Sequence, residues 1–293
     1  MKYFLGLILI LFIFGCNNQK TEIKVMTWNI WHGGLHGDKA HNFEKDSSNT
    51  INVVKVLQQH NPDVLFMQET YCCGMDLAKE AGYKYSWRGS SNLSIHSRYP
   101  IIDTIRVYKP FHSHGVKINV SGKEIMCYNI WLHYLPNYIK DAETKSAAEL
   151  IEGEEATRYS EIKSILTELA PVLENSDKVP VIMGGDFNSG SHIDWIESTK
   201  HLHKNKVVQW PVSKEMFKYG FKDSFREIHP DPLKTQAYTC GYIFENNRFD
   251  RIDYIYYKGN SLDLKDSKII SEDPPGGFFN SDHRAVVSTF IIN

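Results

Sequence analysis

Residues 179–188 constrain the fold more than any other part of the chain. Their sequence, Val-Pro-Val-Ile-Met-Gly-Gly-Asp-Phe-Asn, begins as a short apolar run that predicts a buried strand, and two glycines end it. Asp186 and Asn188 follow two residues apart, so an extended chain points both side chains the same way. A carboxylate and a carboxamide at the end of a buried strand are costly unless they bind something. Taken alone, the stretch fits an Asp/Asn turn equally well, so its function depends on the rest of the chain.

Apolar runs of strand length recur along the whole chain. Those between residues 83 and 131 follow one another closely, which predicts an antiparallel meander rather than βαβ units. Besides the strand at 179–188, we expect strands at 23–29, 64–69, 83–87, 93–96, 101–108, 116–120, 124–131, 248–257, 268–271 and 285–292.

Helices are expected in fewer places. Ser47 and Ser48 can cap a helix that runs to about residue 59, and Ser191 can cap a short one. Residues 145–173 form the longest helical pattern, which Pro171 interrupts near its end. Residues 200–248 are expected to be irregular. Because no linker or repeat divides the chain, residues 22–293 are predicted to form one mixed α/β domain.

The N-terminus has the pattern of a signal peptide. Lys2 precedes an unbroken apolar run at 3–14, which is too short to span a bilayer comfortably. The Gly-Cys at 15–16 resembles a bacterial lipobox. That resemblance makes 1–15 the signal peptide, Cys16 the lipidated first residue of the mature protein, and 16–21 a short tether. An ordinary secretory signal or an N-terminal anchor helix are the alternatives. We therefore expect a cell-envelope protein, lipid-anchored at the outer membrane or cell surface, or otherwise periplasmic or secreted.

Charge and cysteine content narrow the functional classes. The formal net charge is −2, and no run of Lys and Arg is longer than a pair, which argues against a protein that holds long nucleic acid by its backbone. Cys127 lies in an apolar run and is expected to be a buried free thiol. In an oxidising compartment, Cys72 or Cys73 could form a disulfide with Cys240.

Polar residues gather at the ends of the apolar strand runs. Each one alone fits a hydrogen-bonded strand end or a turn cap, but ligand sites in sheet proteins commonly collect at one end of the strands. An oxygen-rich set without thiolates favours Mg²⁺, Mn²⁺ or Ca²⁺ over Zn²⁺, and such a cation suits the attack of water on a phosphate ester. The set is Asn29, Glu69, His133, Asp186, Asn188, Asp253, Asp282 and His283.

Six short motifs in chain order carry a family resemblance. They are Thr-Trp-Asn-Ile at 27–30, Gln-Glu at 68–69, Trp-Leu-His at 131–133, Gly-Gly-Asp-Phe-Asn at 184–188, Arg-Ile-Asp-Tyr at 251–254 and Ser-Asp-His at 281–283. This set resembles the endonuclease/exonuclease/phosphatase family, which includes pancreatic deoxyribonuclease, apurinic endonucleases, neutral sphingomyelinases and inositol polyphosphate phosphatases. The resemblance covers about residues 22–293. It implies a four-layered α/β sandwich, in which two mixed β-sheets pack face to face with helices outside.

The resemblance also implies a metal site. Glu69, with Asn29 close by, would hold the divalent metal, Mg²⁺ or otherwise Mn²⁺ or Ca²⁺, against the phosphate. Asp282 would be a further ligand of the metal or of water. Where apurinic endonucleases have an acidic residue two positions after the first Asn, this chain has Trp31, which weakens a repair-enzyme interpretation.

Catalytic roles follow from the same resemblance. Asp186 would orient and activate the attacking water, and Asn188 would hydrogen-bond the phosphate. His133 and His283 would stabilise the transition state as donors or general acids. Asp253 would orient a histidine.

The substrate is the least determined part of the prediction. Candidate contacts are the loop at 32–41, His112, His114, residues 134–138, and the 200–248 insertion with Trp195, Trp210, Arg226 and His229. Their aromatic rings could stack on bases or a sugar or contact a lipid, although packing of the insertion against the fold is the favoured explanation. We expect a monomeric phosphodiesterase that acts on small or lipid-derived phosphodiesters. The alternatives are a secreted nuclease, a phosphomonoesterase acting on inositol phosphates, and a surface lipoprotein that binds a ligand without catalysis.

Overall fold

The computed structural model describes residues 20–36, 46–241 and 249–293, and within these ranges the strands form two six-stranded sheets. The first sheet has the order β11-β12-β1-β2-β4-β3 and the second the order β5-β6-β7-β8-β10-β9. The first contains β1 (Thr21–Asn29), β2 (Val64–Gln68), β3 (Tyr85–Arg88), β4 (Leu93–Ser97), β11 (Leu262–Ile270) and β12 (Ala285–Ile292). The second contains β5 (Ile101–Arg106), β6 (Ser113–Val120), β7 (Lys123–Trp131), β8 (Val181–Asp186), β9 (Lys222–Asp223) and β10 (Asp253–Lys258). The pairs β1–β2 and β7–β8 are parallel and the other pairs are antiparallel, so both sheets are mixed.

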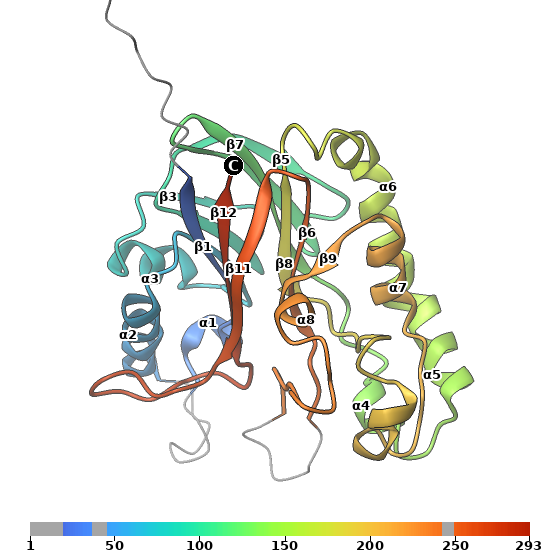
Figure 1. Cartoon of the computed structure of the whole chain (residues 1–293). Helices are drawn as coiled ribbons and strands as arrows, with labels where there is room; N and C mark the ends of the chain where they lie inside the picture. Colours follow the sequence, from blue (N-terminus) through green and yellow to red (C-terminus); the bar gives the residue numbers. More distant parts are fainter. Residues whose placement is uncertain (1–19, 37–45, 242–248) are drawn as a thin grey trace, which may run out of the picture.

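Helices cover the outer face of each sheet (Figure 1). On the first sheet lie α2 (Thr50–His60) and α3 (Gly74–Glu80), and on the second lie α5 (Ala147–Glu154), α6 (Ser160–Glu174) and α7 (Pro211–Lys218). The shorter helices are α1 (Trp31–Gly34), η2 (Ser47–Asn49), α4 (Tyr138–Asp141), the π-helix η3 (Glu155–Tyr159), η4 (Glu197–Leu202) and α8 (Ser224–Ile228). This arrangement confirms the predicted four-layered sandwich. Over the described ranges, no helix has both the length and the apolar character that crossing a membrane requires.

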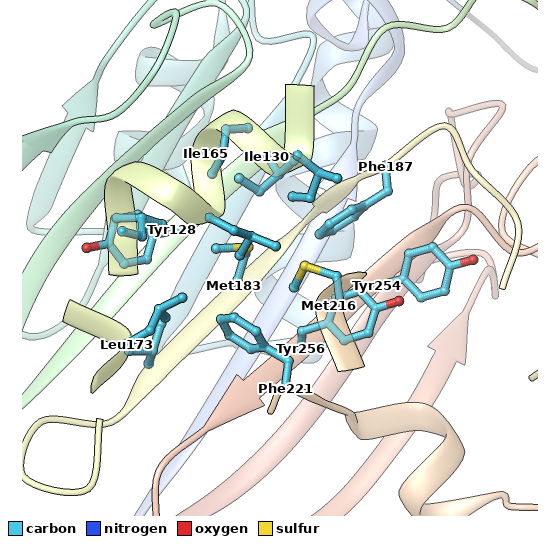
Figure 2. Packing of buried hydrophobic residues seen from close by; sticks show 14 of the residues in the cluster. Tyr128, Ile130, Ile165, Leu173, Met183, Phe187, Met216, Phe221, Tyr254 and Tyr256 are labelled. Carbon is cyan, nitrogen blue, oxygen red and sulfur yellow. The ribbon is translucent and has the colours of Figure 1, made fainter. Parts of the chain in front are cut away.

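Three apolar clusters hold the four layers together. The central cluster fills the space between the sheets, with Val25 and Phe66 from one side and Ile182 from the other among its members. A second cluster packs α2 and α3 on the first sheet. The third packs α6 and α7 on the second sheet, and in Figure 2 Ile165 and Met216 from these helices lie over the strand residues of the same cluster.

The two glycines at the end of β8 are required by close packing between the layers. A Cβ on Gly184 would lie 2.4 Å from the Phe66 ring of the opposite sheet. A Cβ on Gly185 would lie 2.0 Å from the carbonyl oxygen of Ile130 on the neighbouring strand. The glycines therefore let β8 approach both neighbours, and the strand delivers Asp186 deep inside the sandwich, where it is 1% exposed.

Several local predictions were wrong. The strands predicted between residues 83 and 131 do pair antiparallel, but they do not form one meander, because β3 and β4 belong to the first sheet and β5, β6 and β7 to the second. The strand expected from residue 248 starts at Asp253. No helix starts at Ser191 in the described part of the chain, where 192–194 form a turn, and the irregular stretch expected at 200–248 contains α7, β9 and α8. Pro171 does not end its helix, because it occupies an exposed position and the buried Leu169 and Leu173 on either side keep α6 packed until Glu174.

The helix expected at 47–59 starts differently from the prediction. Asp46, not a serine, accepts a hydrogen bond from the Ser48 backbone at 2.8 Å, and a turn of 3-10 helix precedes α2. The helix buries Val53, Val54 and Leu57, whereas Ile51 is 43% exposed.

The cysteines also pair differently from the expectation. Cys72 and Cys73 form a disulfide with each other, and Cys240 is a buried free thiol beside Asp250. Cys127 is buried and free, as predicted. The signal peptide at 1–15 and the lipidation site Cys16 lie outside the described residues.

Candidate active site

The predicted site residues come together where strands of both sheets end. Asn29 is the last residue of β1, Glu69 comes directly after the parallel strand β2, and Asp186 is the last residue of β8. Across the sheet, Asp186 pairs with Trp131 on β7 and with Asp253 on β10. Next to these strand ends is a cavity of about 670 Å³, lined by His32, Glu69, Tyr71, Phe111, His112, Trp131, His133, Tyr134, Asp186, Asn188 and His283.

Asn29 connects the two sheets at the base of the site. Its amide nitrogen donates to Glu69 Oε1 and to Asp186 Oδ2, both at 3.1 Å. Its carbonyl oxygen accepts from the backbone N–H of Trp31, while the N–H of His32 donates to Glu69 Oε2 at 3.0 Å. The side chain of Asn29 therefore fixes the carboxylates of Glu69 and Asp186 relative to each other.

Backbone strain is concentrated around this cavity. Glu69 has a φ of 55° and Asn188 a φ of 50°, and Trp31, His32 and Tyr71 also have positive φ values of 52°, 54° and 34°. Non-glycine residues adopt this conformation at a cost of about 1–3 kcal/mol each, and such residues cluster at active sites and ligand clamps. The surrounding fold therefore holds the groups of this cavity in set directions before any ligand binds.

Asp282 is a partly buried acid whose charge interacts with that of Glu69. Its Oδ1 atom has no hydrogen-bond partner among the described residues. Burial raises the pKa of Asp282 to about 6; the charge on His283 opposes this shift and the charge on Glu69 adds to it. Two acids that repel each other, one with a free oxygen, are a donor set that fits a hard divalent cation. Glu69, Asp282 and the carboxamide of Asn29 could thus hold the expected metal.

Asp186, Asp253 and His283 form a second compact group. One ligand atom from each lies within 4.8 Å of the others, so this group could also hold a cation. His283 Nδ1 is 2.9 Å from Asp253 Oδ2, and His283 Nε2 is 4.0 Å from Asp186 Oδ2. Burial lowers the pKa of His283, but the charges of Asp253, Asp186 and Asp282 more than offset it, so the pKa stands well above its usual value. Without a cation, the geometry therefore favours an imidazolium held between carboxylates.

Asp186 is an acid of unusual basicity. Burial and the charge of Asp253 raise its pKa, while His283 and the Asn29 amide act in the opposite direction. Its Oδ1 accepts from the backbone N–H of Asn188 at 3.0 Å. The Asn188 amide nitrogen donates to the carbonyl of Leu132 at 2.9 Å, so this side chain is fixed at the cavity wall.

His133 is positioned by its own loop. Its Nδ1 is 3.1 Å from both the N–H and the carbonyl of Leu135, which leaves Nε2 as the nitrogen that can serve a ligand. The backbone N–H of His133 donates to Glu161 at 2.8 Å. Arg158, fully buried, donates to the carbonyls of His133 at 3.3 Å and Pro136 at 2.9 Å.

The sequence interpretation missed Arg158 and Glu161, although a signal for both exists. Each lies four residues before an apolar position of the same helical face, Ile162 and Ile165, so a charged side chain there must be buried. It also missed Asn92, whose carbonyl oxygen accepts from the Glu69 backbone at 3.2 Å and whose amide donates to Phe111. No local pattern distinguishes Asn92 from an ordinary turn residue.

The candidate substrate contacts divide into two groups. His32, His112 and Tyr134 line the cavity. His114 is buried against Trp87 and does not line the cavity. In and beside the 200–248 insertion, Trp195 and Trp210 pack edge to face in a cluster of their own, and Arg226 forms a buried ion pair with Asp194, so these residues stabilise the fold.

Comparison with known proteins agrees with the geometry. The model of the Endonuclease/Exonuclease/phosphatase family matches residues 26–283. Uncharacterized protein F14F9.5 of Caenorhabditis elegans is 28% identical over 265 residues, which cover 81% of this chain and 79% of that protein. Truncated Caenorhabditis elegans TDP2 has a TM-score of 0.59 at 18% identity and matches over 92% of this chain and 97% of its own. An AP endonuclease from Archaeoglobus fulgidus has a TM-score of 0.57 at 19% identity, over 91% and 98% of the two chains. With a family match over nearly the whole chain and the fold shared with these structures, the chain belongs to the endonuclease/exonuclease/phosphatase family of phosphoester-hydrolysing enzymes.

Proposed function

We propose that the protein is a divalent-metal-dependent phosphodiesterase, which splits a phosphodiester with water into a phosphomonoester and an alcohol. The observation that carries this proposal is the convergence of Glu69, Asp186, Asn188, His133 and His283 on one cavity. These residues combine an acidic group for a cation, a buried base and two imidazoles around a space that can receive a phosphate. That combination suits hydrolysis of a phosphate ester.

The metal would be held by Glu69, Asn29 and Asp282. When bound, a hard divalent cation, Mg²⁺ or otherwise Mn²⁺ or Ca²⁺, would supply positive charge that offsets the charge of the phosphate. The unpartnered Oδ1 of Asp282 and its repulsion by Glu69 support this assignment over the group around His283. In that other group, the 2.9 Å contact between His283 and Asp253 already provides charge compensation.

The proton transfers are assigned to the chain's own residues. Asp186 accepts a proton from the attacking water, and its raised pKa makes it a stronger base than an exposed carboxylate. Asn188 orients the phosphate through its amide. His283, charged and held by Asp253, and His133, through Nε2, donate hydrogen bonds to the oxygens that gain negative charge, and one of them protonates the leaving oxygen.

The test is hydrolysis of bis(p-nitrophenyl) phosphate with Mg²⁺ or Mn²⁺, followed by the release of p-nitrophenol. Asp186→Asn and His283→Ala are each expected to lower kcat by about 10² to 10⁴. The matched controls Asp263→Asn and His201→Ala, both exposed, should keep full activity. Chelation should abolish turnover, and added Mg²⁺ or Mn²⁺ should restore it.

The outcomes separate this proposal from its alternatives. No turnover of the diester, with inorganic phosphate released from inositol phosphates, would instead support a phosphomonoesterase. Degradation of plasmid DNA that Asp186→Ala abolishes would support a secreted nuclease. Metal binding by calorimetry without turnover of any ester would support a ligand-binding lipoprotein.

We further propose that the enzyme acts in the cell envelope as a lipid-anchored monomer. The support is the apolar run followed by Gly-Cys at 15–16. Expression of the full chain and of Cys16→Ser, followed by membrane fractionation and mass spectrometry of the N-terminus, tests the anchor. A protein that remains in the membrane fraction after Cys16→Ser contradicts lipidation.

A further inference from the structure

One side of the cavity is built from aromatic side chains that the proposed chemistry does not use. Phe111, Trp131 and Tyr134, here called the aromatic wall, all line it. The rings of Phe111 and Trp131 meet edge to face with centroids 5.6 Å apart, and those of Trp131 and Tyr134 lie 6.2 Å apart. Phe111 and Tyr134 remain 39% and 55% exposed, which leaves ring surface open to a ligand.

The aromatic wall is fixed in place by backbone contacts. The Asn92 amide donates to the carbonyl of Phe111 at 3.1 Å, and the N–H of Trp131 donates to the carbonyl of His112 at 2.9 Å. Asn92 also holds the backbone of Glu69, so the wall and the proposed metal ligand share a support. Stacking of a ligand ring here would cost the protein little conformational entropy, because the wall is already ordered.

The aromatic wall is continuous with the catalytic group. The rings of His133 and Tyr134 are stacked, 5.2 Å apart with an interplanar angle of 15°. The phosphate-binding end of the cavity carries Asp186 and Asn188, and the aromatic wall begins where His133 ends. A group esterified to a phosphate at that end can therefore reach this wall.

The cavity volume agrees with a substituent of this kind. About 670 Å³ is in the range of sites that enclose small organic ligands and exceeds what a phosphate alone needs. Flat rings gain most from such a wall, because stacking on aromatic side chains requires a planar face.

We propose that the aromatic wall is a binding subsite for a planar ring, of the nucleobase or aryl kind, carried by the phosphodiester substrate. This subsite rests on the proposed function for its phosphate end. It deepens that function by naming the substrate as a ring-bearing phosphodiester, in preference to one with alkyl groups alone.

The test is a binding measurement that needs no turnover. Phenylphosphonate and cyclohexylphosphonate carry the same charged group on rings of similar size, and neither can be hydrolysed at a phosphate ester. With Mg²⁺ present, isothermal calorimetry is expected to show phenylphosphonate binding at least about fivefold more tightly. A second pair, adenosine monophosphate and ribose 5-phosphate, asks whether a nucleobase gains the same advantage.

Two variants locate the effect. Phe111→Leu and Tyr134→Leu keep apolar volume at exposed positions and should reduce the preference for the planar ring to less than twofold. Phe217→Leu and Tyr85→Leu alter comparably exposed rings that do not line the cavity and should leave the preference unchanged.

The outcomes distinguish this proposal from the proposed function. Equal affinity for both phosphonates, or a preference that survives Phe111→Leu and Tyr134→Leu, overturns the ring subsite even where bis(p-nitrophenyl) phosphate is hydrolysed. Loss of the preference in these two variants, with the preference kept in Phe217→Leu and Tyr85→Leu, supports it. A preference for phenylphosphonate in a protein that hydrolyses no diester would leave the subsite standing and refute the phosphodiesterase.

Discussion

His114 is a buried histidine whose replacement should stabilise the protein, and increasingly so in acid. It lies on β6 against Trp87, with ring centroids 4.6 Å apart, and a Cβ on Gly89 would lie only 2.3 Å from its ring. Neither ring nitrogen has a hydrogen-bond partner in the described ranges. Burial lowers the pKa of His114 from 6.5 to about 3, with the nearby carbonyl of Pro110 acting in the opposite direction.

The magnitude follows from linkage between protonation and folding. Below pH 6.5 the unfolded chain binds a proton at this position that the folded chain refuses, so stability falls as the pH drops until about pH 3. Each pH unit below pH 6.5 lowers the unfolding free energy of the wild-type protein by about 1.4 kcal/mol, which gives a loss of about 2 kcal/mol at pH 5 relative to pH 7.5. His114→Phe removes the titrating group and keeps a flat ring of similar size. At pH 7.5 the unfolding free energy of the His114→Phe variant should already exceed that of the wild-type protein by about 1 kcal/mol, because the substitution removes two buried polar atoms without partners.

The assay is urea unfolding followed by tryptophan fluorescence at pH 7.5, 6 and 5. The quantity of interest is the difference in unfolding free energy between His114→Phe and the wild-type protein, in which the contributions of titrating groups that do not interact with His114 cancel. His201→Phe, at an exposed position, serves as the control and should show no such slope. A difference for His114→Phe that does not change between pH 7.5 and 5 would refute the reasoning.

Three further substitutions test the site and its supports. Asp253→Asn removes the charge that holds His283 and should lower kcat for bis(p-nitrophenyl) phosphate by about 10² or more with an unchanged circular dichroism spectrum; an unaltered kcat contradicts the orienting role. Gly185→Ala places a Cβ against the neighbouring strand at 2.0 Å and should cost at least about 3 kcal/mol in urea unfolding, whereas a neutral effect would mean that β8 can shift. Arg158→Met leaves the buried Glu154 carboxylate without its partner and should cost about 3–5 kcal/mol at pH 8, with a smaller loss at pH 5, because burial raises the pKa of Glu154 to about 7 and protonation then removes the uncompensated charge. The same cost at both pH values would show that the charge is not what matters.

Local sequence patterns predicted the strands and the residues at their ends. Alternation in β1 puts Val25 between the sheets and Met26 under the helices, and a side-chain period of two is visible in any single sequence. The prediction of one site from Asn29, Glu69 and Asp186 rested on motif order, and the structure brings all three within hydrogen-bonding reach. These three residues lie at or just after strand ends, so their positions along the chain were enough to predict that they share a site.

The supports of the site could not be predicted in the same way. Asn92 bridges Glu69, which follows β2 of the first sheet, and Phe111, which precedes β6 of the second, and that contact depends on how the sheets are placed in space. The division of the expected meander between two sheets could not be predicted either. The spacing of strands along the chain indicates that they pair, but it does not determine which strands pair with each other. Helices within 200–248 were missed because α7 and α8 are short, and their stability comes from packing.

The disulfide between Cys72 and Cys73 has an unusual thermodynamic consequence. A disulfide between distant residues stabilises a fold because it lowers the conformational entropy of the unfolded chain. A disulfide between adjacent residues, such as Cys72 and Cys73, closes only a small ring and leaves that entropy nearly unchanged. Reducing it should therefore hardly change the unfolding free energy. Its influence is confined to the turn just after Glu69, where Cys72 lies against Gly33 and Tyr71 lines the cavity. A reducing buffer would alter this part of the catalytic cavity without leaving a trace in a melting curve.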